Sequence, residues 1–137
     1  MSVLDICDTR PPVVLPDTTV ADTIRLMLDA RVGAIAVVDS ARIVAGIFTE
    51  RDVLSRLALS RRNPEQIPVR ELMTTPVEMA TEETSEAEAL STMLERHYRH
   101  LPVVDASGRL LGMLSIRHVL QGRVEDLLRQ LEAQKTR

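Results

Sequence analysis

The feature that most restricts how this chain can fold is an internal repeat with an offset of 66 residues. The triplet Val37-Val38-Asp39 returns as Val103-Val104-Asp105, and Gly46 returns as Gly112. The same offset relates further positions without a gap: Thr18 and Thr84, Ala21 and Ala87, Met27-Leu28 and Met93-Leu94, Arg51 and Arg117, and Val53-Leu54 and Val119-Leu120. Self-similarity at one period indicates a supersecondary unit used twice, and two such small units usually pack on each other.

Each copy predicts the same order of elements. In the first copy, Thr19-x-x-Asp22 is typical of a helix start, and apolar residues follow it at helical spacing. Two runs rich in β-branched residues, 35–38 and 43–48, then flank a short polar turn, which indicates a β-hairpin. A second helix is expected from Arg51 to about Leu59. The second copy repeats this order from Ser85-x-x-Glu88 onward.

The boundaries between these units follow from prolines and apolar spacing. Two prolines within residues 63–68 prevent a continuous helix there, so this stretch is predicted to be a linker. The second helix of the second copy is expected from Arg117 to about Gly122. An amphipathic face on the tail needs cover from the body or from another chain; its residues are Val124, Leu127, Leu128 and Leu131. We therefore predict a first motif at 1–62, a linker and leading segment at 63–75, a second motif at 76–122 and a C-terminal helix at 123–137.

Composition excludes several classes of function. A formal charge of −3 gives no general attraction to nucleic acid or anionic lipid, and Phe48 and Tyr98 are the only aromatic side chains for stacking on bases. The N-terminus does not resemble a signal peptide, and no run approaches the ~20 apolar residues that span a membrane. Cys7 is the single cysteine, which excludes an internal disulfide. We expect a cytoplasmic protein that binds neither nucleic acid nor membranes.

The repeats resemble the CBS motif, a β-α-β-β-α unit that occurs in tandem pairs called Bateman modules. The resemblance runs from about Val13 to Gly122 and is carried by residues 46–52 (Gly-Ile-Phe-Thr-Glu-Arg-Asp) and 99–105 (Arg-His-Leu-Pro-Val-Val-Asp), with 112–118 as a weaker match. It implies a stand-alone regulatory protein with an α+β fold, in which two motifs pack through their sheets as a pseudo-twofold pair. It also implies a disc-shaped homodimer and adenosine-containing ligands in clefts between the motifs.

A nucleotide site is predicted around Asp52. This residue lies one turn into a helix, where its carboxylate can accept hydrogen bonds from both ribose hydroxyls, as the matching family residue does. Thr49 and the free N–H groups of the helix start suit a phosphate, and Arg51 adds positive charge. By resemblance, the other motif closes this cleft. The remaining predicted contacts are Arg99 and His100 for phosphate, Leu101 and Pro102 along the strand, Thr75 and Val77 from the leading segment, and Ile47 for the base.

The matching position in the second copy departs from the family pattern. His118 stands where the ribose carboxylate is expected, and residues 33–36 opposite it carry no charge. A histidine cannot reproduce a bidentate anionic acceptor. We therefore predict one nucleotide per chain, bound at the Asp52 cleft.

Plainer interpretations of the same residues stay open. Thr49-x-x-Asp52 also satisfies an ordinary helix cap, and Arg99 with His100 also fits a solvated strand edge. His97 and His100 have a spacing seen in metal sites, yet no carboxylate or cysteine completes the set, so no metal is predicted. The sequence contains no serine-protease-type triad, Walker loop or dinucleotide fingerprint, and we predict that the chain is not an enzyme.

The leading hypothesis is a regulatory module that requires no cofactor and binds an adenosine nucleotide as its regulatory ligand. AMP is the first candidate, with ADP, ATP, NAD and S-adenosylmethionine as alternatives. Binding would favour one arrangement of the motifs, which a partner protein in trans would detect. The alternative hypothesis is a dimeric scaffold or interaction protein whose clefts are vestigial.

Overall fold

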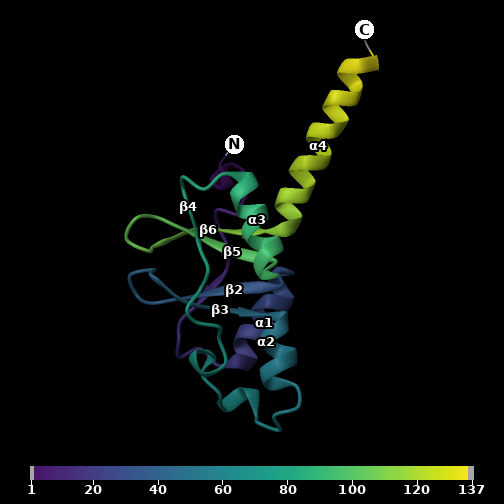
Figure 1. Ribbon diagram of the computed structural model, residues 1–137. Helices are drawn as coiled ribbons and strands as arrows, with labels where there is room; N and C mark the ends of the chain where they lie inside the picture. Colours follow the sequence, from purple (N-terminus) through teal and green to yellow (C-terminus); the bar gives the residue numbers. More distant parts are fainter. Residues whose placement is uncertain (1, 136–137) are drawn as a thin grey trace.

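Two similar halves make up the chain, and each contains a three-stranded sheet with helices beside it (Figure 1). The computed structural model describes residues 2–135. The first sheet contains β1 (Val13–Val14), β2 (Ala34–Val38) and β3 (Val44–Thr49), and the second contains β4 (Ala80–Thr81), β5 (His100–Val104) and β6 (Leu110–Ser115). The central strand of each sheet pairs in parallel with the short strand and antiparallel with the last one. The predicted α+β fold of two repeated units is confirmed.

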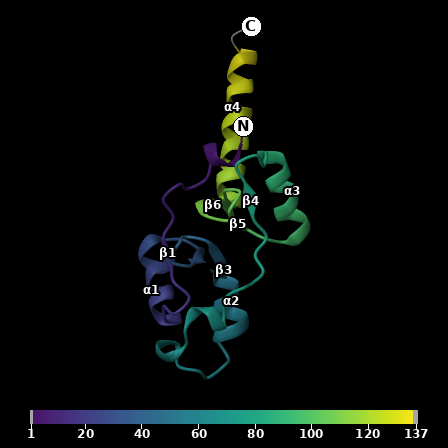
Figure 2. The same ribbon diagram turned by 90° about the vertical axis from the view of Figure 1, so that its left-hand side faces the viewer.

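The helices lie along one side of the two sheets, and the hairpins β2–β3 and β5–β6 extend to the other side (Figure 1). They are α1 (Val20–Ala30), α2 (Glu50–Asp52), α3 (Glu86–Arg96) and α4 (Ile116–Lys135). A π-helical stretch, Val53–Leu57, continues α2, and the short 3-10 turns are Val3–Asp5, Pro64–Gln66 and Val69–Glu71. A view turned by 90° shows the two halves stacked, with α4 extending beyond the body (Figure 2).

The first helix of each half starts and ends in the same way. The Thr19 hydroxyl accepts a hydrogen bond from the Asp22 N–H at 3.1 Å, and the Ser85 hydroxyl accepts one from the Glu88 N–H at 3.1 Å. These bonds satisfy N–H groups that have no partner inside the helix. Both helices end at a residue with a left-handed backbone, where the chain turns toward β2 or β5. The two predicted helix starts are confirmed.

The second helix follows the prediction in the first half and differs from it in the second. In the first half, the three residues of α2 and the π-helical stretch together run from Glu50 to Leu57, close to the predicted range of Arg51 to about Leu59. In the other half, α4 runs without interruption from Ile116 to Lys135, so there is no break at Gly122 between a motif helix and a C-terminal helix. A glycine inside a helix costs ~1 kcal/mol relative to alanine, which weakens a helix without ending it. Among the residues that the structure describes, no helix is long and apolar enough to cross a bilayer.

The leading segment of each half crosses to the opposite half. Val3 is fully buried in the core of the second half, and Asp8 pairs antiparallel with Met113 of β6. In the same way Val69 is buried in the core of the first half, and Thr74 pairs with β3. Residues 2–8 precede the first half in sequence but pack with the second half. Residues 67–74 precede the second half but pack with the first. This crossing interlocks the two motifs.

A third apolar cluster joins the two sheets. Its buried members come from both motifs: Ala34, Ala36, Val38, Ile47, Leu110 and Met113. The hairpins add backbone bonds between the halves, from the Val44 N–H to the Gly108 oxygen at 3.1 Å and from the Leu110 N–H to the Arg42 oxygen at 3.0 Å. The pair of motifs thus shares one continuous interface, as expected for units too small to bury their apolar faces alone.

Two glycines permit the close approach of the crossing segments. A Cβ atom added at Gly46 would lie 2.3 Å from Sδ of Met73, and one added at Gly112 would lie 2.7 Å from both the Asp8 oxygen and Cys7 Sγ. Contacts this short cannot be tolerated without a shift of the neighbour. The repeat therefore keeps glycine at these two strand positions because backbone and side chains of the leading segments lie directly against them.

A pair of glycine substitutions tests this packing. Gly112→Ala places its Cβ against a backbone oxygen and is expected to destabilise the chain by ~1–3 kcal/mol. Gly122→Ala, within α4, meets no atom within 4 Å and is expected to stabilise it by ~0.5–1 kcal/mol. Urea unfolding followed by circular dichroism measures both changes. A Gly112→Ala midpoint equal to that of the wild type would contradict the close approach.

Candidate functional site

Asp52 lies at the end of α2, in contact with the leading segment of the second motif, and is only 4% exposed. Its Oδ2 atom accepts hydrogen bonds from the Thr49 N–H at 3.0 Å and from the Thr49 hydroxyl at 3.2 Å. In return, the Asp52 N–H donates to the Thr49 hydroxyl oxygen at 3.2 Å. The strand-turn-helix sequence thus folds into a reciprocal cap, which fixes the carboxylate at the start of α2.

The second carboxylate oxygen faces the leading segment of the second motif. The Thr74 hydroxyl donates to Asp52 Oδ1 at 2.9 Å, and Nε of Arg56 lies 3.6 Å from the same atom. Thr74 is held in place by two backbone bonds with Ile47, of 3.0 and 2.8 Å. A carboxylate offers about four acceptor positions. Three of those on Asp52 accept hydrogen bonds from Thr49 and Thr74, and Arg56 adds an ion pair.

The equivalent position in the second half is built differently. His118 replaces Asp52, and its Nδ1 accepts a hydrogen bond from the Ser115 N–H at 3.0 Å. The Ser115 hydroxyl lies 3.1 Å from Nδ1 and accepts from the His118 N–H at 3.3 Å. The imidazole therefore takes over the capping role of the carboxylate without supplying its negative charge. Asp8 stands at the position that matches Thr74, so an acidic group lies on the leading segment of this half instead.

His100 lies at the start of β5, partly buried against the first motif. Its Cε1 atom and the Glu50 Oε1 atom approach the backbone of Gly33, at 3.4 and 3.3 Å from the place of an added Cβ. Burial lowers the pKa of His100 below its ordinary value, Glu50 opposes this shift, and the nearby His118 and Arg99 add to it. His100 therefore lies beside the start of α2, where a phosphate was predicted.

The other predicted site residues differ in their exposure. Ile47 is 7% exposed and Val77 is partly buried, and both contact the cluster between the sheets. Thr75, Arg51 and Arg99 are exposed, and Pro102 is buried on β5. Leu101 is 1% exposed and packs in the core of the second motif, so we omit its side chain from the proposed contacts.

Two residues of this site were not predicted from the sequence. Thr74 precedes the predicted Thr75, and only the antiparallel pairing with Ile47 turns its hydroxyl toward Asp52. Arg56 follows Asp52 by four residues, a spacing at which side chains on a helix meet. That spacing is visible in the sequence and could have drawn attention to Arg56.

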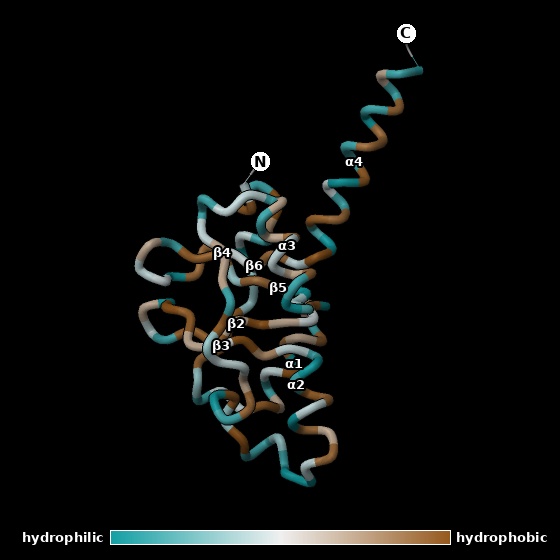
Figure 3. The backbone as a smooth tube through the Cα atoms, in the orientation of Figure 1, coloured by the Kyte–Doolittle hydropathy of each residue, from teal (hydrophilic) through white to brown (hydrophobic). Residues whose placement is uncertain are grey.

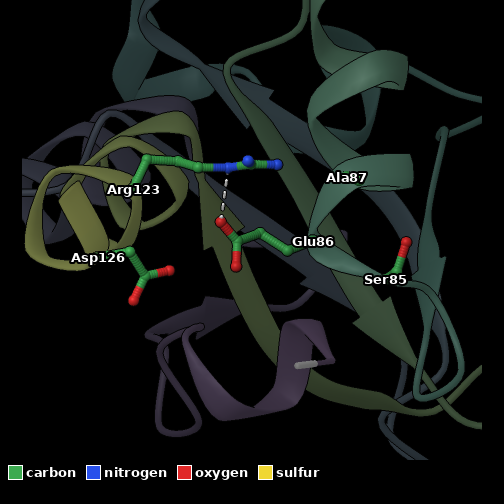
Figure 4. Close-up of a pocket in the computed structure, with 5 residues that line it drawn as sticks. All are labelled: Ser85, Glu86, Ala87, Arg123 and Asp126. Carbon is green, nitrogen blue, oxygen red and sulfur yellow. Dashed lines mark ion pairs between the residues drawn. The ribbon is translucent and has the colours of Figure 1, made fainter. Parts of the chain in front are cut away.

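A separate cavity of about 310 Å³ lies between the start of α3 and α4, away from Asp52 (Figure 4). Ser85, Glu86, Ala87, Arg123 and Asp126 line it. Nε of Arg123 lies 3.1 Å from Glu86 Oε1, an ionic contact without the alignment of a hydrogen bond. Because Glu86 belongs to α3 and Arg123 to α4, this ion pair lies where the two helices contact each other. Within residues 2–135, no three His, Cys, Asp or Glu side chains are arranged to hold a metal ion.

Comparison with known proteins identifies the family. The model of the CBS domain matches residues 3–59 and 69–132, so the chain belongs to the CBS-domain family and contains a tandem pair of CBS domains. The uncharacterized 17.7 kDa protein in the bps2 3′ region of Acidianus ambivalens is 37% identical over 123 residues, which cover 90% of this chain and 73% of that protein. The chain spans 54% of one further curated relative and 22% or less of several others.

Solved structures share the fold. A protein with CBS domains from Burkholderia ambifaria is 33% identical, with a TM-score of 0.82, and the match covers 90% of this chain and 92% of that one. CBSX2 in complex with AMP is 28% identical, with a TM-score of 0.80, and the match covers 90% and 96% of the two chains. CBSX2 from Arabidopsis thaliana gives a TM-score of 0.79. The paired arrangement of two CBS units is therefore confirmed.

The environment of His100 predicts a dependence of stability on pH. An unfolded chain has the ordinary histidine pKa of about 6.5, whereas the folded chain has a lower one. As the pH falls from about 7.5 to about 5, the unfolded state takes up a proton that the folded state binds less readily, so the free energy of unfolding decreases. Urea unfolding at several pH values should show a smaller decrease for His100→Gln. His97→Asn, at an exposed helix end, should keep the wild-type decrease, and an equal effect of both variants would contradict this role of His100.

Proposed function

We propose that the chain is a regulatory CBS pair that binds an adenosine nucleotide at Asp52 and carries out no reaction. The observation that carries this proposal is the carboxylate of Asp52, buried beside the leading segment of the second motif and fixed by the cap with Thr49. A ribose presents two adjacent hydroxyls, and a fixed carboxylate is an acceptor suited to both of them. AMP is the first candidate because CBSX2, a protein of the same fold, was solved in complex with AMP.

The remaining contacts of the proposed site come from both motifs. Exposed Arg51 and Arg99 supply positive charge for phosphate, together with Thr49 and with His100 beside the start of α2. Ile47, Val77 and Pro102 supply apolar surface, and Thr75 supplies a polar edge. ADP, ATP, NAD and S-adenosylmethionine contain the same adenosine and are the alternative ligands.

Thr74 gives the proposed signal a physical route. The ribose needs Oδ1 of Asp52, which now accepts the Thr74 hydroxyl at 2.9 Å. Binding would therefore exchange the Thr74 bond for a ribose bond and remove one contact between the first motif and the segment that leads into β4. Because only a ligand with different affinities for two arrangements can shift their populations, this exchange links occupancy of the cleft to the second motif. A partner protein in trans would detect the new arrangement.

A second candidate function, a dimeric scaffold, is favoured by exposed leucines that the repeat conserves. Leu28 and Leu94 are 71% and 60% exposed at matching places of α1 and α3, and Leu54 and Leu120 are 74% and 50% exposed 66 positions apart. All four lie on elements of the helical side of the molecule (Figure 1). Hydrophobic residues also recur along α4 (Figure 3). Exposed apolar surface of this kind is typical of an interface, and we propose a homodimer through this side.

Calorimetric titration with AMP tests the nucleotide site. We expect one AMP per chain, and Asp52→Asn should bind AMP at least about tenfold more weakly, because a hydrogen bond to a charged acceptor contributes ~1.5–3 kcal/mol. His118→Asn changes the matching residue of the second half and should leave the affinity unaltered. Two equivalent AMP molecules per chain, or an unchanged Kd in Asp52→Asn, would contradict the proposal.

A thermal-shift panel separates the sensor from the scaffold. A nucleotide at 100 times its Kd should raise the free energy of unfolding by about 2.7 kcal/mol. If AMP, ADP, ATP, NAD and S-adenosylmethionine all leave the melting temperature unchanged, the scaffold becomes the better account.

Sedimentation equilibrium tests the homodimer. Replacing Leu28 and Leu94 together by Glu places two charges in the proposed interface and should yield a monomer. Leu15→Glu, at a leucine that is 53% exposed outside the helices, is the matched control and should leave the dimer intact. A wild-type chain that sediments as a monomer would exclude the interface.

A further inference from the structure

We infer that Arg56 is a positioning residue that holds the leading segment of the second motif against the Asp52 site. Its guanidinium group donates from Nη1 to the Met73 oxygen at 2.9 Å and to the Leu72 oxygen at 3.4 Å. From the same side chain, Nε lies 3.6 Å from Asp52 Oδ1. One side chain therefore contacts both the acidic group of the proposed site and the backbone just before Thr74. The inference rests on the proposed function, because it concerns the same site.

The chemistry of arginine suits this double role. A guanidinium group carries several N–H donors in a rigid plane and stays charged, so it can bond to carbonyl oxygens while it neutralises a carboxylate. Asp52 is almost fully buried, and a buried carboxylate without a cation nearby would be costly. Arg56 itself is about half exposed. We call the bonds from Arg56 to the Leu72 and Met73 oxygens the strap. The strap holds the same segment as the backbone bonds between Ile47 and Thr74.

The strap would keep the segment in place after the Thr74 hydroxyl leaves Asp52. Release of the Thr74 hydroxyl removes one bond from the segment, whereas the carbonyl oxygens of Leu72 and Met73 remain bonded to Arg56. Residues 75–77 would then keep their place beside the ligand. Arg56 therefore acts on affinity through the position of this segment and needs no contact with the nucleotide.

The second half lacks this strap. The residue that matches Arg56 is Gly122, and an added Cβ there would meet no atom within 4 Å. Its leading segment pairs with β6 through two Asp8–Met113 bonds of 3.0 and 2.9 Å, which match the Ile47–Thr74 bonds. The chain thus contains an internal reference: two equivalent backbone pairs, of which one is covered by an arginine.

Hydrogen exchange on the full chain tests the strap without any ligand. In Arg56→Met, the amides of Ile47 and Thr74 should exchange at least about tenfold faster, while those of Asp8 and Met113 should stay as in the wild type. Arg62→Met is the matched control, because Arg62 forms its ion pair with Glu71 of the same segment, at 2.7 Å, and not with Asp52. Unchanged exchange at Ile47 and Thr74, or equal acceleration at all four amides, would overturn the strap.

Calorimetry with AMP then tests the role in binding. Arg56→Met should weaken AMP binding at least about tenfold, whereas Arg62→Met should bind as the wild type does. Arg56→Lys keeps the charge without the planar fork and should fall between the two; it also replaces Arg56→Met if that variant fails to fold. Faster exchange with unchanged affinity would overturn the positioning role. If the wild type binds no nucleotide, the proposed function fails, and the exchange experiment still decides whether the strap exists.

Discussion

The antiparallel pairing of Ile47 with Thr74 is the contact on which the rest of this structure depends. It carries the leading segment of the second motif onto β3 of the first, where Gly46 leaves room for Met73. The same pairing brings the Thr74 hydroxyl to Asp52, so that a buried carboxylate and a crossing segment stabilise each other. One backbone contact therefore links the packing of the motifs to the chemistry of the proposed site.

The two halves share a fold and differ in their charged groups. The repeat retains the capped helices, the hairpins, the close-approach glycines and the crossing segments in both copies. At the proposed site, however, Asp52 and Arg56 are matched by His118 and Gly122. Folding needs only the first set of features, because apolar packing and backbone bonds hold each half. The difference in the second set is the physical basis for proposing one nucleotide per chain.

Much of this architecture could be predicted from the sequence, because local signals and the repeat agreed. Thr19 and Ser85 predicted helix starts, and the runs rich in β-branched residues before and after the turn at Asp39 predicted a hairpin. The pairing of the leading segments with the opposite sheets leaves no local pattern, because it spans a long sequence separation; only the family resemblance placed the leading segment with Thr75 and Val77 beside Asp52. For the same reason Thr74 was missed, and Leu101, chosen from the family motif, proved to point into the core.

The most direct test of the central claim is a crystal structure of this chain with AMP. The account predicts that both ribose hydroxyls donate to Asp52 and that the Thr74 hydroxyl no longer bonds to Oδ1. It would be contradicted by AMP bound elsewhere, or by a structure at saturating AMP in which Asp52 keeps its bond to Thr74 and touches no ribose.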